Sequence, residues 1–203
     1  MKIGKREIHF NTFLKKGLTK LDDRYGVYMV CGRQGSGKNY YAAMFLLQFA
    51  SQATNIYSNV HSLKIPHKPF TKLDDILDNV EEKSIFLIDE VSKKYNRNSK
   101  TDMKFYSWLQ QSRKRKRIVI MITQEWRETP MWLRRPVKFT CSTQKTRLLG
   151  AFGIFTTTIG DAENMVFNKD EGEYETPPIY FKIYKRNWKI ARLYDTFEPI
   201  NEL

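Results

Sequence analysis

A glycine-rich octapeptide with a lysine near its end is the first feature of the chain that could do chemistry. It reads GRQGSGKN over residues 32–39 and matches the pattern GxxxxGK. In such a turn, backbone N–H groups point inward at phosphate oxygens, and the following helix adds a favourable dipole. Lys38 would reach the β- and γ-phosphates of ATP. We expect the nucleotide to contact Gly32, Arg33, Gln34, Gly35, Ser36, Gly37, Lys38, Asn39 and Tyr40.

The last position of the octapeptide departs from the usual motif. A serine or threonine normally stands there, and its hydroxyl ligates the Mg²⁺ that accompanies the nucleotide. Here the residue is Asn39. An amide oxygen is also a hard ligand, so Asn39 is a candidate Mg²⁺ ligand, either directly or through water.

Two adjacent carboxylates follow a short apolar run further along the chain. Residues 85–88 are all apolar, and Asp89 and Glu90 come directly after them. The run is typical of a buried parallel strand, and α/β sheets bind their ligands at the carboxyl ends of such strands. We therefore expect Asp89 to act in the outer shell of Mg²⁺. Glu90 suits a base that orients water for attack on the γ-phosphate.

A second apolar run ends in a glutamine. Residues 118–122 form the run, and Thr123 and Gln124 follow it. A parallel strand here would bring Gln124 to the same sheet edge as the two carboxylates. There its amide could hydrogen-bond the γ-phosphate or the attacking water. The alternative is a strand-terminal glutamine with no role.

The elements that must position these residues alternate between strand and helix. Strands are expected over 25–31, 55–59, 85–88, 118–122 and 137–140. Helical spacing of apolar residues appears over 41–50, from Leu73 to Val80, and from Phe105 to Leu109, where Thr101 and Asp102 can cap the helix. This alternation predicts an α/β fold with a mainly parallel sheet flanked by helices.

The texture of the sequence changes after about residue 142. Thr, Tyr and Gly then alternate with apolar residues, which predicts antiparallel strands appended to the sheet. We divide the chain into a basic N-terminal extension (1–22), a P-loop ATPase core (23–142) and a β-rich addition to the same domain (143–203).

The charge of the chain points to a polyanionic partner. Thirty-five Lys and Arg residues against 22 Asp and Glu leave a net charge of +13, and ten of the cations fall within residues 93–117. The partner would be nucleic acid or an anionic membrane face. The run SRKRKR at 112–117 exceeds what a helix C-terminus needs. It could contact a phosphate backbone, or it could insert an arginine into a neighbouring subunit's ATP site.

Composition also excludes several classes of protein. The two cysteines, Cys31 and Cys141, lack CxxC spacing, and the first twenty residues lack the apolar core of a signal peptide. No apolar stretch approaches the roughly 18 to 20 residues that span a bilayer. The three histidines lack metal-ligand spacing, and no nucleophilic triad is evident. We expect a reduced, cytoplasmic protein, in the host cytoplasm or associated with the virion if the protein is viral.

Taken in order, the segments GRQGSGKN, IFLIDE and RKRKRIVIMITQ resemble the HerA–FtsK superfamily of DNA-pumping ATPases. This superfamily of RecA-like (ASCE) P-loop NTPases includes genome-packaging ATPases of small viruses and Zot-type phage assembly proteins. The resemblance covers roughly residues 24–140. It implies ATP hydrolysis with Mg²⁺ and a homo-oligomeric ring, commonly a hexamer, that threads double-stranded DNA.

The resemblance also implies an arginine that acts across a subunit boundary. In FtsK-like motors this arginine stands eleven residues before the strand-terminal glutamine, which is the position of Arg113 here. Arg115 and Arg117 are near alternatives. Arg134 and Arg135 occupy the place of a further arginine-bearing segment and are weaker candidates.

Four functions follow as hypotheses. The first is a ring-forming motor that packages viral DNA and docks on a capsid or a membrane-associated viral protein. The second is a Zot-like morphogenesis ATPase that exports phage DNA. The third is a small-molecule P-loop kinase, and the fourth is a binding module that ATP switches. The carboxylate pair and Gln124 favour water as the acceptor over a metabolite.

Overall fold

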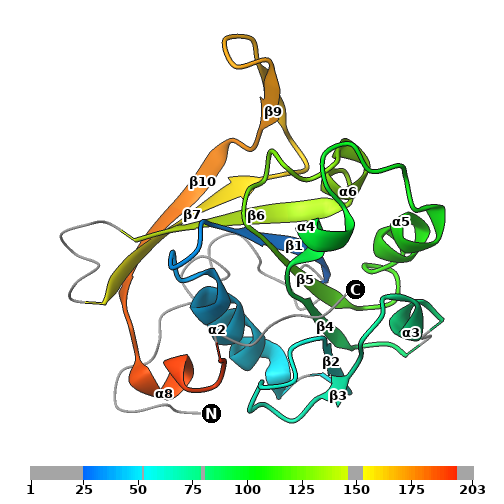
Figure 1. The fold of residues 1–203 in the computed structure, drawn as a ribbon, viewed down its shortest axis with the longest axis vertical. Coiled ribbons are helices and arrows are strands. Elements are labelled where there is room, and N and C mark those ends of the chain that lie inside the picture. Colours follow the sequence, from blue (N-terminus) through cyan, green and yellow to red (C-terminus); the bar gives the residue numbers. More distant parts are fainter. Residues whose placement is uncertain (1–24, 52, 79–80, 146–152, 196–203) are drawn as a thin grey trace.

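The computed structural model describes residues 25–51, 53–78, 81–145 and 153–195. Its main sheet contains β1 (Gly26–Cys31), β2 (Ile56–Ser58), β3 (Lys68–Pro69), β4 (Ile85–Ile88), β5 (Ile118–Thr123), β6 (Val137–Gln144), β7 (Ile154–Asp161) and β10 (Pro178–Lys185). The strands lie side by side in the order β10-β7-β6-β1-β5-β4-β2-β3 (Figure 1).

The larger part of this sheet is parallel. Strands β6, β1, β5, β4, β2 and β3 all run in one direction, while β7 and β10 are antiparallel to their neighbours. β1 lies between β5 and β6, and β5 separates it from β4. The carboxyl ends of β1, β5 and β4 therefore open side by side at one edge of the sheet.

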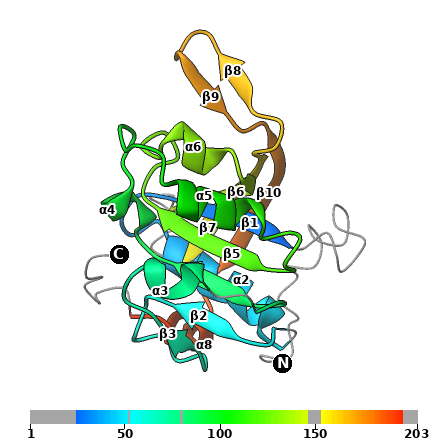
Figure 2. The same ribbon diagram turned by 90° about the vertical axis from the view of Figure 1, so that its right-hand side faces the viewer.

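Helices cover both faces of the parallel strands (Figures 1 and 2). On one face lies α2 (Lys38–Ala50), and on the other lie α3 (Asp74–Leu77), α4 (Val91–Lys94), α5 (Met103–Gln110) and α6 (Met131–Arg134). Successive strand residues point to opposite faces, so Tyr28 and Val30 pack in the core beneath α2, whereas Val27 and Met29 pack beneath the other helices. The two cores fix the central strands in place.

Local sequence accounts for most of these elements. β4 and β5 are buried along their whole lengths, as their uninterrupted apolar runs predict. The expected cap of α5 is confirmed, because the Asp102 carboxylate accepts a hydrogen bond from the Phe105 N–H at 3.0 Å. By contrast, α3 is a single turn from Asp74 to Leu77, shorter than the apolar spacing suggests.

The chain beyond the parallel strands extends the same sheet. β6 runs from Val137 to Gln144, so the expected boundary at residue 142 falls inside a strand. β7 and β10 then add two antiparallel strands at that side. The predicted α/β class, with its mainly parallel sheet and appended antiparallel strands, is confirmed. The expected extension at 1–22 lies outside the described residues.

A hairpin of β8 (Val166–Asn168) and β9 (Glu173–Glu175) projects from the body of the molecule (Figure 1). Arg127 anchors it through ion pairs with Glu171 and Glu175, while Phe167 and Tyr174 are exposed on it. The chain then passes along β10 to the short helix α8 (Trp188–Ala191), which packs on α2. Among the described residues, no helix is both long and apolar enough to cross a membrane.

Candidate active site

The glycine-rich turn joins β1 to α2, as the octapeptide predicts. The Gly32 N–H donates to the Gln124 carbonyl at 3.0 Å, which ties the start of the turn to the end of β5. Gly35 and Gly37 have φ angles of +77° and +91°, a region that residues with a side chain rarely adopt. Gly37 is the N-cap of α2, so the turn ends where the helix N–H groups begin.

Close packing on both sides leaves no room for side chains at two of the glycines. A Cβ atom at Gly32 would lie 2.8 Å from the Thr143 carbonyl oxygen, and one at Gly37 would lie 2.7 Å from Cδ1 of Phe155. The Thr143 hydroxyl contacts Ser36 Oγ at 2.9 Å and donates to the Cys31 carbonyl at 3.1 Å. The turn is therefore braced by β6 and β7 as well as by its own strand.

Lys38 and Asn39 form the first turn of α2. The Asn39 Oδ1 atom is buried and finds no hydrogen-bond partner in the part of the chain that the structure describes. A buried, unpaired amide oxygen is costly in an otherwise well-packed protein. It is a hard donor at the position where this motif places its metal ligand, so the residues present fit an Mg²⁺ ion. The ion would neutralise charge on the phosphates.

Asp89 follows β4 and is 3% exposed. Its Oδ2 atom accepts a hydrogen bond from the Tyr194 hydroxyl, and its Oδ1 atom accepts one from the Glu90 N–H at 2.8 Å. Burial raises the pKa of Asp89 above its ordinary value, and the charge of Glu90 adds to the rise, while the two hydrogen bonds and the charge of Lys38 oppose it. Asn59 at the end of β2 holds the Asp89 backbone on both sides, at 2.8 and 3.1 Å.

Glu90 has an unusual backbone conformation. Its φ and ψ are 53° and 41°, in the left-handed region, and it forms the N-cap of α4. For a residue with a side chain such a conformation costs of order 1–3 kcal/mol, and residues of this kind cluster at active sites. The Glu90 Oε2 atom lies 2.5 Å from Lys93 Nζ, in an ion pair one helical turn away. The strain and the ion pair together set the direction of this carboxylate.

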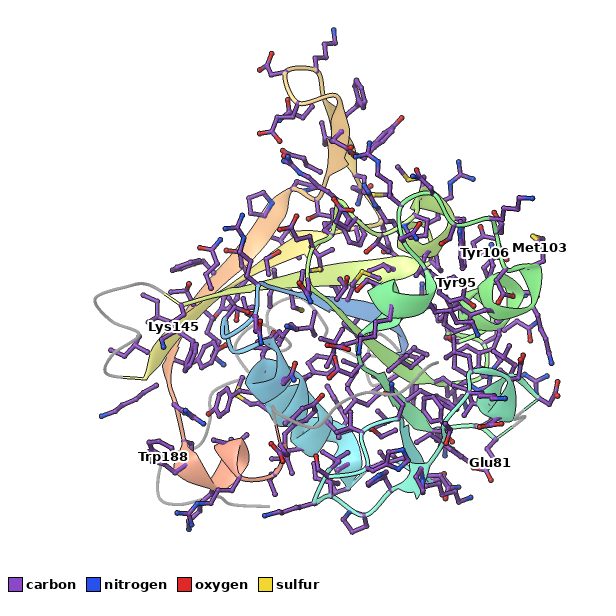
Figure 3. All side chains as sticks on the ribbon, viewed as in Figure 1. Glu81, Tyr95, Met103, Tyr106, Lys145 and Trp188 are labelled. Atoms are coloured by element: carbon purple, nitrogen blue, oxygen red, sulfur yellow. The ribbon has the colours of Figure 1, made fainter. Side chains whose placement is uncertain are left out.

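Gln124 directly follows β5, which lies between the strand of the glycine-rich turn and the strand of Asp89. Its side chain is exposed and lines a cavity of about 1040 Å³. The cavity is bordered by residues 32–36 of the turn and by Lys145, which directly follows β6 and is labelled in Figure 3. Lys38 and Asp89 do not line it, so it lies beside the phosphate cradle.

The basic run lies at the opposite edge of the sheet. Arg113 is exposed and lies three positions after the end of α5 and five positions before the start of β5. Gln124 follows the other end of that strand. A six-residue strand spans roughly 20 Å. Arg113 therefore cannot reach the site of its own chain without a large movement. Arg117 is 2% exposed, with its guanidinium over the rings of Phe86 and Trp108.

Arg134 is also buried in the structure. Its Nε and Nη2 atoms donate to the carbonyls of Thr129 and Arg127 at 2.6 and 2.5 Å, so it organises the loop that follows Gln124. Its neighbour Arg135 is exposed at the end of α6.

Three side chains that hold the site were missed by sequence reasoning: Asn59, Thr143 and Tyr194. Asn59 and Tyr194 lie 30 and 105 positions from Asp89, and Thr143 lies 107 positions from Ser36. Each is an ordinary residue type at the end of a strand or helix. A single sequence carries no local signal for such distant pairs.

Comparisons with known proteins find likeness in structure but not in sequence. No family model matches the chain, and no curated protein matches it. The N-terminal domain of zonular occludens toxin from Neisseria meningitidis matches with a TM-score of 0.61 at 16% identity, over 84% of this chain and 98% of that one. This chain has the fold of a P-loop NTPase.

A second group of matches comes from a virus. The genome packaging NTPase B204 from Sulfolobus turreted icosahedral virus 2, in complex with sulfate, matches at a TM-score of 0.53 and 11% identity, over 80% of this chain and 96% of that one. Its complex with ATP-gammaS gives 0.50 and 16%, over 79% and 96%. The resemblance to packaging ATPases and Zot-type proteins, expected from three motifs, is confirmed at the level of fold.

Proposed function

We propose that this protein is an ATP-hydrolysing nucleic-acid translocase, a ring-forming motor that packages viral DNA into a capsid. ATP bound with Mg²⁺ would occupy the turn between β1 and α2, with Lys38 on the β- and γ-phosphates. Asn39 and Asp89 would hold the metal. Glu90 would orient the attacking water, and Gln124 would contact the γ-phosphate. Such a motor would work in the cytoplasm of the host cell.

One observation carries the ATPase part of this proposal. Three neighbouring strands bring a glycine-rich anion cradle, a buried carboxylate beside a strained one, and an exposed amide to the same sheet edge. Phosphoryl transfer to water needs little more than positioning and charge neutralisation, and these groups can supply both. The likeness to a packaging NTPase solved with ATP-gammaS supports this assignment.

The placement of Arg113 supports a ring. Because it lies at the far edge of the sheet, it could complete an ATP site only in a neighbouring subunit. The other cations of the run, Lys114 and Lys116, are exposed at the same edge and could contact a phosphate backbone. Double-stranded DNA is the partner that fits both the charge and the proposed motor.

A Zot-like role in phage morphogenesis is the second candidate. It is favoured by the TM-score of 0.61 to the zonular occludens toxin domain, which this chain matches over 98% of that domain's length. In this case the same ATPase site would serve export of DNA at a membrane, with a separate membrane partner.

The first test is ATP hydrolysis with and without long double-stranded DNA. We expect DNA to raise the turnover of the wild-type protein. Glu90→Gln should reduce it by about 10²–10³-fold while nucleotide still binds. Glu163→Gln, at an exposed site between β7 and β8, is the matched control and should behave as wild type. Hydrolysis indifferent to DNA, with transfer of phosphate to a metabolite, would instead identify a kinase.

Mixed subunits test whether Arg113 acts in trans. Arg113→Ala alone should lose about 10³-fold in turnover, while Lys114→Ala should lose little in the absence of DNA. Mixing Arg113→Ala with Glu90→Gln subunits should restore part of the activity, because some interfaces then combine an intact Glu90 with an intact Arg113. No restoration, together with a monomer in the presence of nucleotide, would exclude the ring.

A further inference from the structure

Residues 186–195 form a segment that we call the α8 strap. It leaves the end of β10, includes α8, which packs on α2 (Figure 1), and ends beside the loop that follows β2. The Asn187 N–H donates to the Tyr40 hydroxyl at 3.0 Å, and Ile190 is fully buried against the α2 core. Trp188 points outward from the strap, with 65% of its surface exposed (Figure 3).

The far end of the α8 strap is fastened to the loop after β2. The Lys64 N–H donates to the Leu193 carbonyl at 3.0 Å, and the Asp195 N–H donates to Ser62 Oγ at 3.3 Å. Tyr194 lies between these two contacts and is 6% exposed. Backbone hydrogen bonds on both sides of Tyr194 thus hold it in a fixed position.

The hydroxyl of Tyr194 donates to Oδ2 of Asp89. A buried tyrosine needs a hydrogen-bond partner, and a backbone carbonyl would satisfy that need. Here the partner is a carboxylate that is itself 3% exposed. A hydrogen bond to a buried charged group is among the stronger ones, and it fixes the rotation of the group that accepts it. Asp89 has its other oxygen fixed by the Glu90 N–H.

We propose that Tyr194 is a positioning residue of the nucleotide site, which orients the Asp89 carboxylate and links it through the α8 strap to α2 at Tyr40. The inference rests on the proposed ATPase function and adds a residue to it. Coupling between two sites is reciprocal. If the strap favours Mg²⁺ binding by fixing the carboxylate, then Mg²⁺ and nucleotide bound at that carboxylate must in turn tighten the strap.

The first experiment compares two tyrosine variants at several Mg²⁺ concentrations. Tyr194→Phe removes one oxygen and keeps the ring. We expect kcat for ATP hydrolysis to fall about tenfold with KM for ATP within twofold, and the Mg²⁺ concentration for half-maximal nucleotide binding to rise several-fold. Tyr184→Phe is the matched control: Tyr184 belongs to the same core, and its hydroxyl contacts Thr157 Oγ1 at 3.1 Å. It should leave both quantities within twofold of wild type.

The second experiment uses the unmodified chain, so it does not depend on the folding of a variant. Hydrogen exchange is measured with and without Mg²⁺ and ADP. We expect the amides of Lys64 and Asp195, which bond to the strap or belong to it, to exchange several-fold more slowly in the complex. The amides of the β8–β9 hairpin serve as the control and should not change.

The outcomes separate the two proposals. If wild type hydrolyses ATP but Tyr194→Phe matches it in kcat and in Mg²⁺ dependence, Tyr194 is only a core residue and the inference fails alone. Unchanged exchange at Lys64 and Asp195 on nucleotide binding would also overturn it. If wild type neither binds nor hydrolyses ATP, the proposed function fails, and the inference fails with it.

Discussion

The two edges of the parallel sheet carry polar side chains of opposite character. At the carboxyl edge, Ser36, Asp89 and Thr143 are buried and hydrogen-bonded to groups distant in the chain. At the amino edge, Lys114 and Lys116 are exposed cations. Both edges belong to the same strands, and the same two cores support them.

The difference indicates what each edge is suited to do. Buried groups with fixed partners have lost their hydration and much of their freedom, which is the condition for orienting a reacting group. Exposed cations keep their hydration and their conformational freedom. They can therefore contact a polyanion, whose charges repeat along its length, without needing a fixed geometry. The buried groups of the carboxyl edge are thus suited to chemistry, and the exposed lysines of the amino edge are suited to long-range attraction.

Of the comparisons between the two edges, Lys38→Ala against Lys114→Ala should give the largest difference. Without the charge of Lys38 on the phosphates, ATP hydrolysis should fall by more than about 100-fold, and nucleotide affinity should fall as well. Lys114→Ala removes the same charge at the other edge and should change basal hydrolysis by less than about twofold. Steady-state turnover measures both. Equal losses in the two variants would remove the distinction between the edges.

Gly37→Ala should destabilise the fold at the carboxyl edge. Left-handed backbone costs roughly 1–2 kcal/mol for a residue with a Cβ, and overpacking against the Phe155 ring adds roughly 1–3 kcal/mol. Gly35→Ala has the same backbone strain, but no atom lies within 4 Å of its added Cβ, so it should cost only the first part. Urea unfolding of the two variants gives the difference, and equal losses would contradict the packing argument.

At the amino edge, alanine substitutions of Arg117 and Arg113 should differ in how much they lower the free energy of unfolding. Arg117→Ala should lose about 2–3 kcal/mol, because the buried guanidinium stacks on two rings and donates to the Glu81 carbonyl at 3.2 Å. Arg113→Ala lies at an exposed position and should lose less than about 0.5 kcal/mol. Chemical denaturation at neutral pH measures both. A comparable loss at Arg113 would place it among the structural residues of this edge.

The smallest expected effect is the pH dependence of stability that Glu81 contributes at the amino edge. A hydrogen bond from Tyr57 lowers the pKa of Glu81, with further help from Lys68 and Asn55. A lowered pKa in the folded state means stabilisation above the unfolded pKa that is lost as the pH falls through the folded value. Because this carboxylate is 39% exposed, we expect only a few tenths of a kcal/mol.

The test is unfolding of wild type and Glu81→Gln between pH 3 and pH 7. Wild type should be slightly the more stable near neutral pH, and the two curves should converge in acid. Tyr57→Phe removes the main hydrogen-bond donor to Glu81. Near neutral pH its stability should lie below that of wild type by less than the stability of Glu81→Gln does, and its curve should also converge with wild type in acid. Curves that diverge as the pH falls would contradict the sign of the shift.

A structural feature could be predicted from the sequence when residues close to it in the chain determine it. The strands at Ile85–Ile88 and Ile118–Thr123, and the cap at Asp102, follow from neighbours within a few positions, and they are as expected. The short α3 turn and the polar β8–β9 hairpin carry weak local patterns, so they were misjudged or missed.

The candidate site divides in the same way. The turn at 32–39 and the Asp89–Glu90 pair stand together in the chain and were predicted as units. The side chains that hold them, such as Thr143 and Tyr194, contact them only because the sheet brings distant strands together. Strand order is a tertiary property, so periodicity in one sequence could not reveal those partners.

The order of the strands also sets when the site can exist during synthesis. β1 is the first of the described strands along the chain, yet Gly26 pairs with Ile118 and Val27 with Val137, 92 and 110 positions later. At about 5–20 residues per second, β1 waits roughly 5 to 20 seconds for its neighbours. Until then the turn has neither Gln124 nor Thr143 to brace it. Nucleotide can therefore stabilise only the finished sheet, and it cannot guide the nascent chain toward it.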